Sequence, residues 1–248
     1  MAGAARPDLS VVVLCYRAED MVQDFVSRMQ KVLEHRGLSY ELILVANYHD
    51  NDERPDRTPE IAAELARTDP TIKVVARPKQ GMMGWDMRSG LEASTGETIA
   101  VIDGDGQMPV QDVVLAYEKL RRDGYDLVKM YRAKRFDGVD RRILSSVYNL
   151  LLRLMFPAVK VRDANSKPKL FTREALRRLA LESDGWFVDA EIILRATYQG
   201  LRIGELPTVF YSNRQRASFV RPSAIIEFAR ELIRFRFKRL KDERGSSP

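Results

Sequence analysis

Apolar and polar positions alternate along this chain with two different periods. Short runs of β-branched and aliphatic residues predict buried strands, and apolar positions three or four residues apart predict helices. The expected strands of the first half are 9–15, 40–47, 71–76, 98–102 and 127–131, and the expected helices are 21–35, 61–67, 85–93 and 110–122. This alternation predicts an α/β fold with a single Rossmann-like, mostly parallel sheet flanked by helices.

The second half of the chain is less regular. A basic stretch at 132–142 predicts an irregular connection, and the apolar stretch 143–156 predicts a helix. Further strands are expected at 167–171 and 201–207, and further helices at 173–181 and 188–199. The last helix, from 223 to about 241, is amphipathic and basic. We therefore expect one domain over 1–221 and a basic helix with a tail over 222–248.

The strand at 98–102 runs directly into an acidic loop, Asp103-Gly-Asp105-Gly-Gln107. Glycine allows a close approach of the backbone, and carboxylate and amide oxygens are hard ligands of the kind that Mg²⁺ and Mn²⁺ accept. In a parallel sheet the ligand lies beyond the carboxyl ends of the strands, where the loops 16–20 and 47–52 are also expected. The pattern predicts a divalent metal ion held on a substrate diphosphate.

Two aspartates after a strand have other uses. A calcium-binding EF-hand loop is excluded, because Met108 and Val114 stand where that loop needs glycine and glutamate. A phosphatase of the haloacid dehalogenase type also carries Asp-x-Asp after a strand, although Gln107 fits its pattern poorly. A surface turn without any chemistry is the third interpretation of the same residues.

Composition narrows the classes of function. The chain has 248 residues, of which 45% are hydrophobic and 31% charged, as in ordinary globular proteins. Its one cysteine, Cys15, excludes an internal disulfide and suits a reducing compartment. With only His35 and His49 in the chain, neither a histidine-rich metal site nor a Ser-His-Asp triad is expected.

The charge distribution suggests an anionic partner. The net charge is +6, and basic residues outnumber acidic ones from Arg214 onward. A basic, amphipathic end suggests nucleic acid or an anionic membrane surface, and a solvated helix face is the plain alternative. The start of the chain does not look like a signal peptide, and no apolar run approaches the ~20 residues of a spanning helix. We therefore expect a cytoplasmic protein.

Several segments form a series along the chain, namely 10–19, 81–97, 103–107, 163–171, 186–191 and 200–207. Their order and spacing resemble the large inverting glycosyltransferase family 2, which includes dolichyl-phosphate mannose synthase and bacterial polyprenyl-phosphate glycosyltransferases. The resemblance implies a GT-A fold over 1–221 and transfer of a sugar from a GDP- or UDP-type nucleotide sugar to a polyprenyl phosphate. It also implies a protein peripheral to the membrane surface, with no nucleic acid as partner; a membrane protein partner is left open.

The resemblance assigns a donor site. Asp103, Asp105 and Gln107 match the family's Asp-x-Asp-x-Gln and would hold Mg²⁺ or Mn²⁺, and the two aspartates would be catalytic. The nucleotide sugar would contact Cys15, Tyr16, Glu19, Asn47, Gly84, Arg88, Asp103, Arg214 and Arg216. The chain departs from the family at Asn47, because an aspartate at this point commonly contacts the base. Leu14 and Arg17 also stand where Pro and Asn are usual.

The resemblance assigns an acceptor site as well. In the mannose synthases two arginines and a serine bind the lipid phosphate, and Arg132, Arg142 and Ser145 match them best. A phosphate monoester is largely dianionic at neutral pH and needs no base. A hydroxyl acceptor would need one, for which Asp189 or Glu191 is the candidate. A hydroxyl acceptor, a phosphatase and a non-catalytic membrane-surface binder thus remain alternatives.

The helix expected at 143–156 has an apolar face. This face consists of Ile143, Val147, Leu150, Leu151 and Leu154. The pattern alone favours a core helix, but beside a basic cluster we expect an interfacial helix that guides a polyprenyl chain. The basic final helix would then lie on the membrane surface, where each Lys or Arg adds on the order of 1 kcal/mol.

Overall fold

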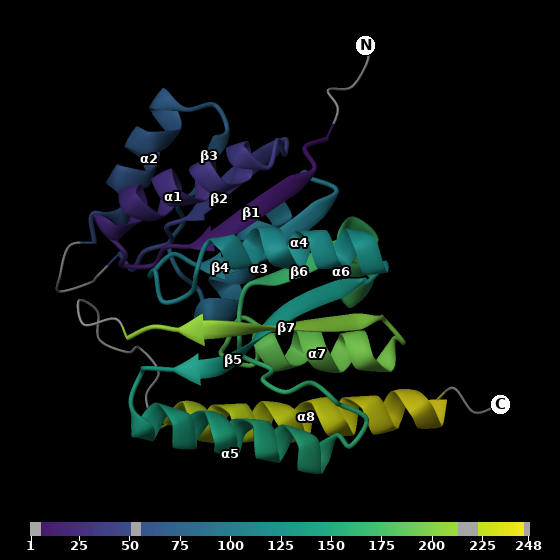
Figure 1. Ribbon diagram of the computed structural model, residues 1–248. Helices are drawn as coiled ribbons and strands as arrows, with labels where there is room; N and C mark the ends of the chain where they lie inside the picture. Colours follow the sequence, from purple (N-terminus) through teal and green to yellow (C-terminus); the bar gives the residue numbers. More distant parts are fainter. Residues whose placement is uncertain (1–5, 51–55, 213–222, 246–248) are drawn as a thin grey trace.

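The computed structural model describes residues 6–50, 56–212 and 223–245. In this part of the chain seven strands form one sheet, and helices cover both of its faces (Figure 1). The strands are β1 (Leu9–Leu14), β2 (Tyr40–Val45), β3 (Ile72–Val75), β4 (Thr98–Asp103), β5 (Leu127–Arg135), β6 (Lys169–Thr172) and β7 (Ile203–Phe210). The helices are α1 (Met21–His35), α2 (Thr58–Thr68), α3 (Met83–Ala93), α4 (Gln111–Asp123), α5 (Val139–Met155), α6 (Arg173–Leu179), α7 (Val188–Tyr198) and α8 (Ser223–Gly245).

The strand order across the sheet is β3-β2-β1-β4-β6-β5-β7. The pairs among β1 to β4 are parallel, as is the pair of β5 and β7, whereas β6 runs antiparallel to both β4 and β5. Lys169 at the start of β6 therefore pairs with Val101 near the end of β4. The start of β6 and the ends of the parallel strands meet at one edge of the sheet. This topology confirms the predicted α/β class with a mostly parallel sheet.

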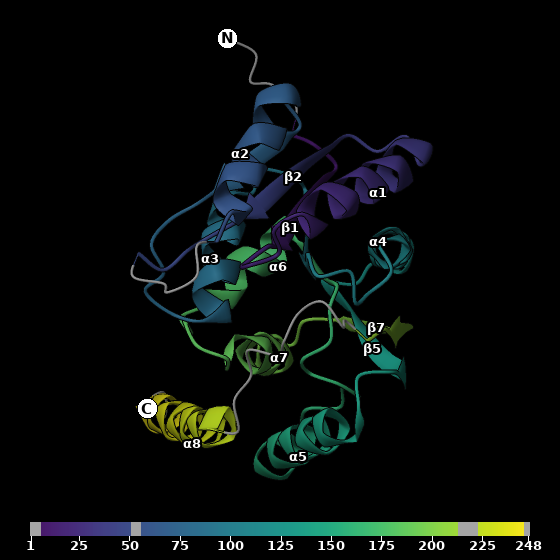
Figure 2. The same cartoon turned by 90° about the vertical axis from the view of Figure 1, so that its left-hand side faces the viewer.

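Two apolar layers pack against the sheet, because alternate residues of each strand point to opposite faces. Val12 and Val101 belong to the layer formed with α3, α6 and α7, and Val11 and Ile102 belong to the layer formed with α1 and α4. Figure 2 shows these two sets of helices on either side of the strands. Every residue of β1 is buried, as expected for a central strand that is covered on both faces.

The prediction of an irregular stretch at 132–142 is wrong. β5 continues to Arg135 because its outer half pairs with β7, with Arg132 opposite Thr208. Gly138, at a φ of 90°, ends the short connection, and α5 begins directly after it. The basic residues of this stretch are therefore fixed on a strand and on the first turn of a helix.

α5 and α8 lie side by side beneath α7 in the view of Figure 1. α5 is anchored by Leu152 and Phe156, and α8 by Phe228 and Leu232, all of which are buried. The ring of Tyr148 stacks on that of Phe228, with the centroids 3.4 Å apart. The C-terminal helix is therefore packed onto the rest of the protein through aromatic and aliphatic side chains.

The apolar face of α5 that the sequence pattern defines points outward for most of its length. The exposed fractions are 58% for Ile143, 39% for Val147, 56% for Leu150 and 68% for Leu154. On α8, Ile226, Ile233 and Phe237 are exposed as well. No helix among the described residues is long and apolar enough to cross a membrane.

Candidate active site

The acidic loop begins where β4 ends. Asp103 is the last residue of β4, and the N–H of Gly104 donates to the carbonyl of Leu14 on the neighbouring strand (2.9 Å). Asp105 Oδ1 accepts the N–H of Gln107 (3.0 Å), and Gln107 Nε2 donates to the carbonyl of Tyr211 (2.9 Å). Because its nitrogen is bound to Tyr211, the Gln107 amide is held in one orientation with Oε1 as its free end for a ligand.

These three side chains fit a metal ion that arrives with a substrate. No group of three or more His, Cys, Asp or Glu side chains suited to a metal occurs among residues 6–50, 56–212 and 223–245. Mg²⁺ is commonly held by only one or two carboxylates, with substrate phosphates and water as the remaining ligands. Asp103, Asp105 and the Gln107 amide oxygen match that mode of binding and not an all-protein cage.

A buried cluster of lysines and an aspartate lies next to Asp103. The Lys167 ammonium is 3.4 Å from both carboxylate oxygens of Asp103 and 3.4 Å from Asp189 Oδ2. Lys169 Nζ is 2.5 Å from Asp189 Oδ1 and also donates to the carbonyl of Ser166 (3.0 Å). Lys167 and Lys169 reach this point because β6 starts beside the end of β4.

Burial and charge act in opposite directions on this cluster. Burial alone would lower the pKa of Lys167, but the carboxylates of Asp103 and Asp189 outweigh it, and the pKa is raised. For Lys169 burial dominates and lowers the pKa to about 8. Burial would raise the pKa of Asp189, but Lys167 and Lys169 hold this pKa below its usual value. Asp189 is therefore an ion-paired carboxylate with little basicity.

The two carboxylates considered as a general base are both engaged. Asp189 is 2% exposed and is bound by two lysines. Glu191, also 2% exposed, accepts the N–H groups of Glu182 (3.0 Å) and Ser183 (2.9 Å) and the Nε–H of Arg195 (2.8 Å). These contacts give Glu191 a structural role, and we do not retain either residue as a base.

The side chain of Asn47, after the end of β2, is engaged in hydrogen bonds within the protein. Its Nδ2 donates to Asp86 (2.9 Å) and Ser89 (3.0 Å), and its Oδ1 accepts the N–H of Arg77 (2.9 Å). Asp86 is in turn paired with the ammonium of Lys79. Asn47 is fully buried, so it braces α3 against the end of β2, and its expected contact with a nucleotide base is not supported by this geometry.

The first loop is only partly open to a ligand. Cys15 is buried, and its thiol donates to the carbonyl of Val13 (3.3 Å). Tyr16 is half-buried, with the Lys79 ammonium 4.3 Å from its ring centroid. Glu19 is exposed and has a φ of 44°, a backbone conformation that few non-glycine residues adopt. Tyr16 and Glu19 are therefore the expected donor-site residues of this loop that a nucleotide can reach.

The first turn of α3 is fastened to the loop that precedes α7. The N–H of Trp85 donates to the carbonyl of Asp184 (3.1 Å), and Arg88 Nη1 is 2.5 Å from Asp184 Oδ1. Gly84 has no room for a side chain, because a Cβ atom there would collide with the carbonyl oxygen of Ser183. The structure thus places Gly84 and Arg88 at a contact within the protein.

Two of the three residues expected at the acceptor phosphate meet. Arg132 Nη2 donates to Ser145 Oγ (3.1 Å), and the same guanidinium forms two hydrogen bonds with Asp163 (2.6 and 2.9 Å). Burial would raise the pKa of Asp163, but Arg132 holds it well below its usual value. Arg142 is exposed and donates to the backbone carbonyl of Arg135. Arg214 and Arg216 lie outside the described residues.

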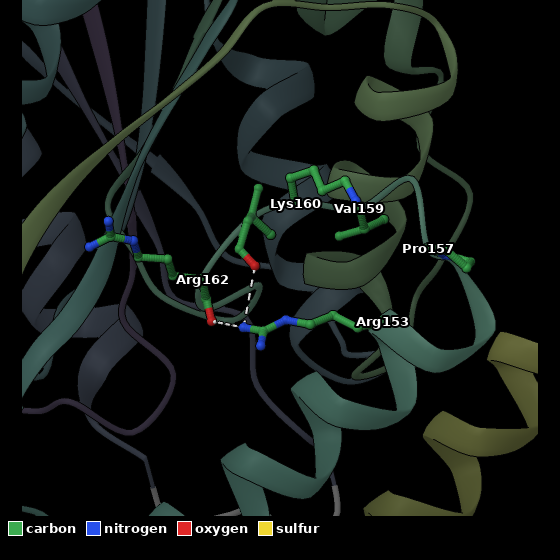
Figure 3. A pocket seen from close by; sticks show the side chains of 6 residues that line it. Arg153, Pro157, Val159, Lys160 and Arg162 are labelled. Atoms are coloured by element: carbon green, nitrogen blue, oxygen red, sulfur yellow. Dashed lines mark hydrogen bonds between the residues drawn. The ribbon is translucent and has the colours of Figure 1, made fainter.

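A separate hollow of about 470 Å³ lies at the other end of α5 (Figure 3). It is lined by Arg153, Pro157, Val159, Lys160, Val161 and Arg162. Arg153 Nη2 donates to the carbonyl oxygens of Val161 (3.5 Å) and Arg162 (2.8 Å), which closes the loop after the helix. The hollow shares no residue with the Asp103 or Arg132 clusters, so we assign it no part in a reaction.

Comparison with known proteins agrees with this arrangement. The family model described as glycosyl transferase family 2 matches residues 10–182, which is more than half of the chain. This chain belongs to glycosyl transferase family 2. The family 2 chain is therefore an enzyme of the transferase class, and its acidic loop, Asp103 to Gln107, lies within the matched region.

Curated relatives of this family 2 chain are named as glycosyltransferases, and two of them as dolichol-phosphate sugar transferases. The chain is 25% identical over 232 residues to a dolichol-phosphate mannosyltransferase of Pyrococcus furiosus, covering 91% of this chain and 63% of the relative. It is 29% identical over 214 residues to the glycosyltransferase AglD of Haloferax volcanii, covering 83% of this chain and only 33% of AglD. It is 26% identical to a dolichyl-phosphate beta-glucosyltransferase of Trichomonas vaginalis over 246 residues, covering 91% of this chain and 72% of the relative.

Solved structures give the same fold. Glucosyl-3-phosphoglycerate synthase of Mycobacterium tuberculosis in complex with UDP superposes with a TM-score of 0.66 at 20% identity, covering 94% of this chain and 80% of the synthase. The complex of that synthase with Mn²⁺, UDP and its glucosylated product gives 0.63 at 19% identity, covering 92% and 77%. These likenesses establish that the family 2 glycosyltransferase has the GT-A fold that its sequence predicts.

Some charged residues of the site are not ones that the sequence pattern predicts. Lys167, Lys169, Asp163 and Asp86 were not among the expected site residues. A signal for the lysines was present, because Lys167 and Lys169 stand two residues apart in a stretch expected to be an extended strand. Asp86 has no comparable signal, because Ser89 and Gly90 follow it at helical spacing.

Proposed function

We propose that this glycosyltransferase moves a sugar from a nucleoside-diphosphate sugar to a polyprenyl phosphate. The observation that carries the acceptor class is the burial of Asp189 between Lys167 and Lys169. An acceptor hydroxyl needs a base to take its proton, whereas a phosphate is already an anion at neutral pH. With Asp189 ion-paired and Glu191 bound to backbone, an acceptor that brings its own negative charge suits this site best.

On the donor side, Asp103 and Asp105 would hold Mg²⁺ or Mn²⁺ with the Gln107 amide oxygen beside them. When bound, the metal ion would neutralise the negative charge that builds up on the leaving nucleoside diphosphate. Solved structures of the synthase hold Mn²⁺ or Mg²⁺ together with UDP, which supports a metal ion and a nucleoside-diphosphate donor. Tyr16 and Glu19 are the candidates for nucleotide contacts.

On the acceptor side, Arg132 and Ser145 would bind the phosphate. They lie where β5 gives way to α5, so the phosphate would be placed at the catalytic edge of the sheet. Asp163 fixes the guanidinium of Arg132 and keeps its charge compensated until an anionic substrate arrives. The names of the Pyrococcus and Trichomonas relatives, both dolichyl-phosphate sugar transferases, support a lipid phosphate.

The surface made by α5 and α8 would rest on the membrane. Exposed Ile143, Leu150 and Leu154 would enter the interface, and exposed Arg230 and Arg234 would meet anionic lipid head groups. An apolar helix that begins beside the acceptor phosphate site provides a path for the polyprenyl chain. We therefore propose a protein peripheral to the cytoplasmic face of a membrane.

The test compares two acceptors that differ by one phosphate. The protein is incubated with Mn²⁺, UDP- or GDP-sugars, and either a polyprenyl phosphate or the matching polyprenol. We expect sugar transfer to the polyprenyl phosphate alone, and we expect Ser145→Ala to raise its KM about threefold to tenfold, as for the loss of one hydrogen bond. Equal transfer to the polyprenol would overturn the acceptor class, and metal-dependent release of phosphate from simple esters would point to a phosphatase.

A further inference from the structure

The two positive charges of Lys167 and Lys169 are balanced by two carboxylates only if Asp103 is counted together with Asp189. Asp189 is shared by Lys167 and Lys169, so one carboxylate faces two ammonium groups. The neighbouring cations have partners of their own, since Lys129 pairs with Glu205 and Arg132 with Asp163. The second carboxylate of the Lys167 ammonium is therefore Asp103, the first residue of the acidic loop.

A divalent ion on Asp103 would disturb this balance. It would take over the carboxylate that compensates Lys167, and it would place two positive charges close to an ammonium group that is 3% exposed. Like charges at such a distance repel strongly where little water screens them. A diphosphate removes the conflict, because its oxygens carry enough negative charge to face the metal ion and the ammonium group together.

We propose that Lys167 makes the binding of the metal ion and of the donor diphosphate mutually dependent. The site takes up the two together and binds the bare ion weakly. This coupling is reciprocal, so the metal raises the affinity for the diphosphate by the same factor by which the diphosphate raises the affinity for the metal. The inference rests on the proposed function, and it assigns Lys167 a positioning role in that donor site.

Lys169 provides a matched comparison within the same cluster. Both lysines are buried and both contact Asp189; Lys169 begins β6, and Lys167 stands two residues before it. Only Lys167 also reaches Asp103. If the coupling comes from the Asp103 contact, replacing Lys167 changes the affinity for the bare ion far more than replacing Lys169.

The experiment measures binding, not turnover. Mn²⁺ is titrated into the full chain by electron paramagnetic resonance, with and without saturating UDP, and again with GDP. In the unaltered protein we expect the nucleotide to tighten Mn²⁺ binding at least thirtyfold. In Lys167→Met, Mn²⁺ alone should bind at least tenfold tighter and the coupling factor should fall at least tenfold. Lys167→Arg keeps the charge, so its affinity for Mn²⁺ alone should stay within threefold of the unaltered protein.

The outcomes separate the inference from the proposed function. Independent binding of Mn²⁺ and nucleotide in the unaltered protein would overturn the inference even if Lys167→Met fails to fold. Equal effects of Lys167→Met and Lys169→Met on the affinity for Mn²⁺ alone would overturn it too, because the contact with Asp103 would then be irrelevant. If neither UDP nor GDP binds at any Mn²⁺ concentration, the donor assignment itself fails.

Discussion

The half of the sheet made by β1 to β4 and the half made by β5 and β7 differ in how completely the residues around them are buried and paired. In the first, every residue of β1 is buried and the polar corner behind it is internally paired through Asn47, Asp86 and Lys79. In the second, α5 and α8 lie side by side beneath α7 and leave Leu150, Leu154 and their neighbours exposed. The apolar side chains of the first half are buried within the protein, whereas the helices beside the second half present an exposed apolar surface.

This difference fits the two substrates of the proposed function. A nucleotide sugar is small and polar, and a closed, hydrogen-bonded scaffold positions it with little rearrangement. A polyprenyl phosphate has a charged head and a long apolar chain, and it requires an open apolar surface beside a cationic site. Exposed apolar patches on otherwise well-packed proteins commonly mark membrane or partner contacts. Under the proposed function, metal and nucleotide would bind at the first half and the lipid at the second.

The largest expected effect is on the donor half. Asp105→Ala should weaken Mn²⁺-dependent binding of UDP or GDP at least a hundredfold, because one of the two carboxylates proposed as metal ligands is lost. Calorimetric titration measures the affinity, and vesicle binding by the same variant serves as the control. Unchanged nucleotide affinity would contradict the assignment of Asp105 as a metal ligand. A loss of vesicle binding in the same variant would contradict the assignment of nucleotide and lipid to different halves.

A smaller effect is expected on the lipid half. Replacing Leu150 and Leu154 together by serine should lower partition onto anionic vesicles at least tenfold, since burying each leucine in a membrane interface is worth about 1.5–3 kcal/mol. The free energy of unfolding should change by less than about 1 kcal/mol, because both side chains are exposed. Vesicle sedimentation and urea melts measure the two quantities.

Leu152 is the matched control on the same helix. It is buried, so Leu152→Ala should cost about 2–5 kcal/mol of stability. Its effect on vesicle partition should be slight under conditions in which the variant is folded. Equal vesicle binding by the double serine variant and the unaltered protein would mean that the exposed face of α5 meets something other than lipid.

The smallest expected effect on ligand binding is at Asn47. Asn47→Ala should cost about 1–3 kcal/mol of stability, because the buried carboxylate of Asp86 and the N–H of Arg77 each lose a partner. The affinity for UDP or GDP in the presence of Mn²⁺ should change less than threefold. A large loss of nucleotide affinity without loss of stability would restore Asn47 as a contact to the base.

Local patterns in the sequence were sufficient for much of the fold. Each strand of the first half is a short apolar run, and the loop at Asp103 carries its chemistry within five residues, so both could be predicted. The stretch at 132–142 was misassigned because its basic composition is typical of a loop, while its extended shape comes from pairing with β7. Local periodicity carries no information about such a distant partner.

The parts of the site that were missed are all made by contacts between distant segments. Lys167 lies next to Asp103 only because β6 runs backward beside β4, and Asp163 reaches Arg132 from the loop before β6. The role of Asn47 changed because its partner, Asp86, comes from the middle of α3. In each of these cases the sequence shows a polar or charged residue, but it does not show which distant residue forms its hydrogen bond or ion pair.

The reversed strand β6 also bears on how the chain assembles. Among the described residues, β1 to β4 pair only with one another and with β6, whereas β5 and β7 pair with each other and connect to β4 through β6. The sheet therefore cannot be completed in the order of synthesis, since β5 is made before the strand that must separate it from β4. This four-residue strand joins the two halves, so the Asp103 end of β4 and the Arg132 segment of β5 belong to one sheet only once β6 lies between them.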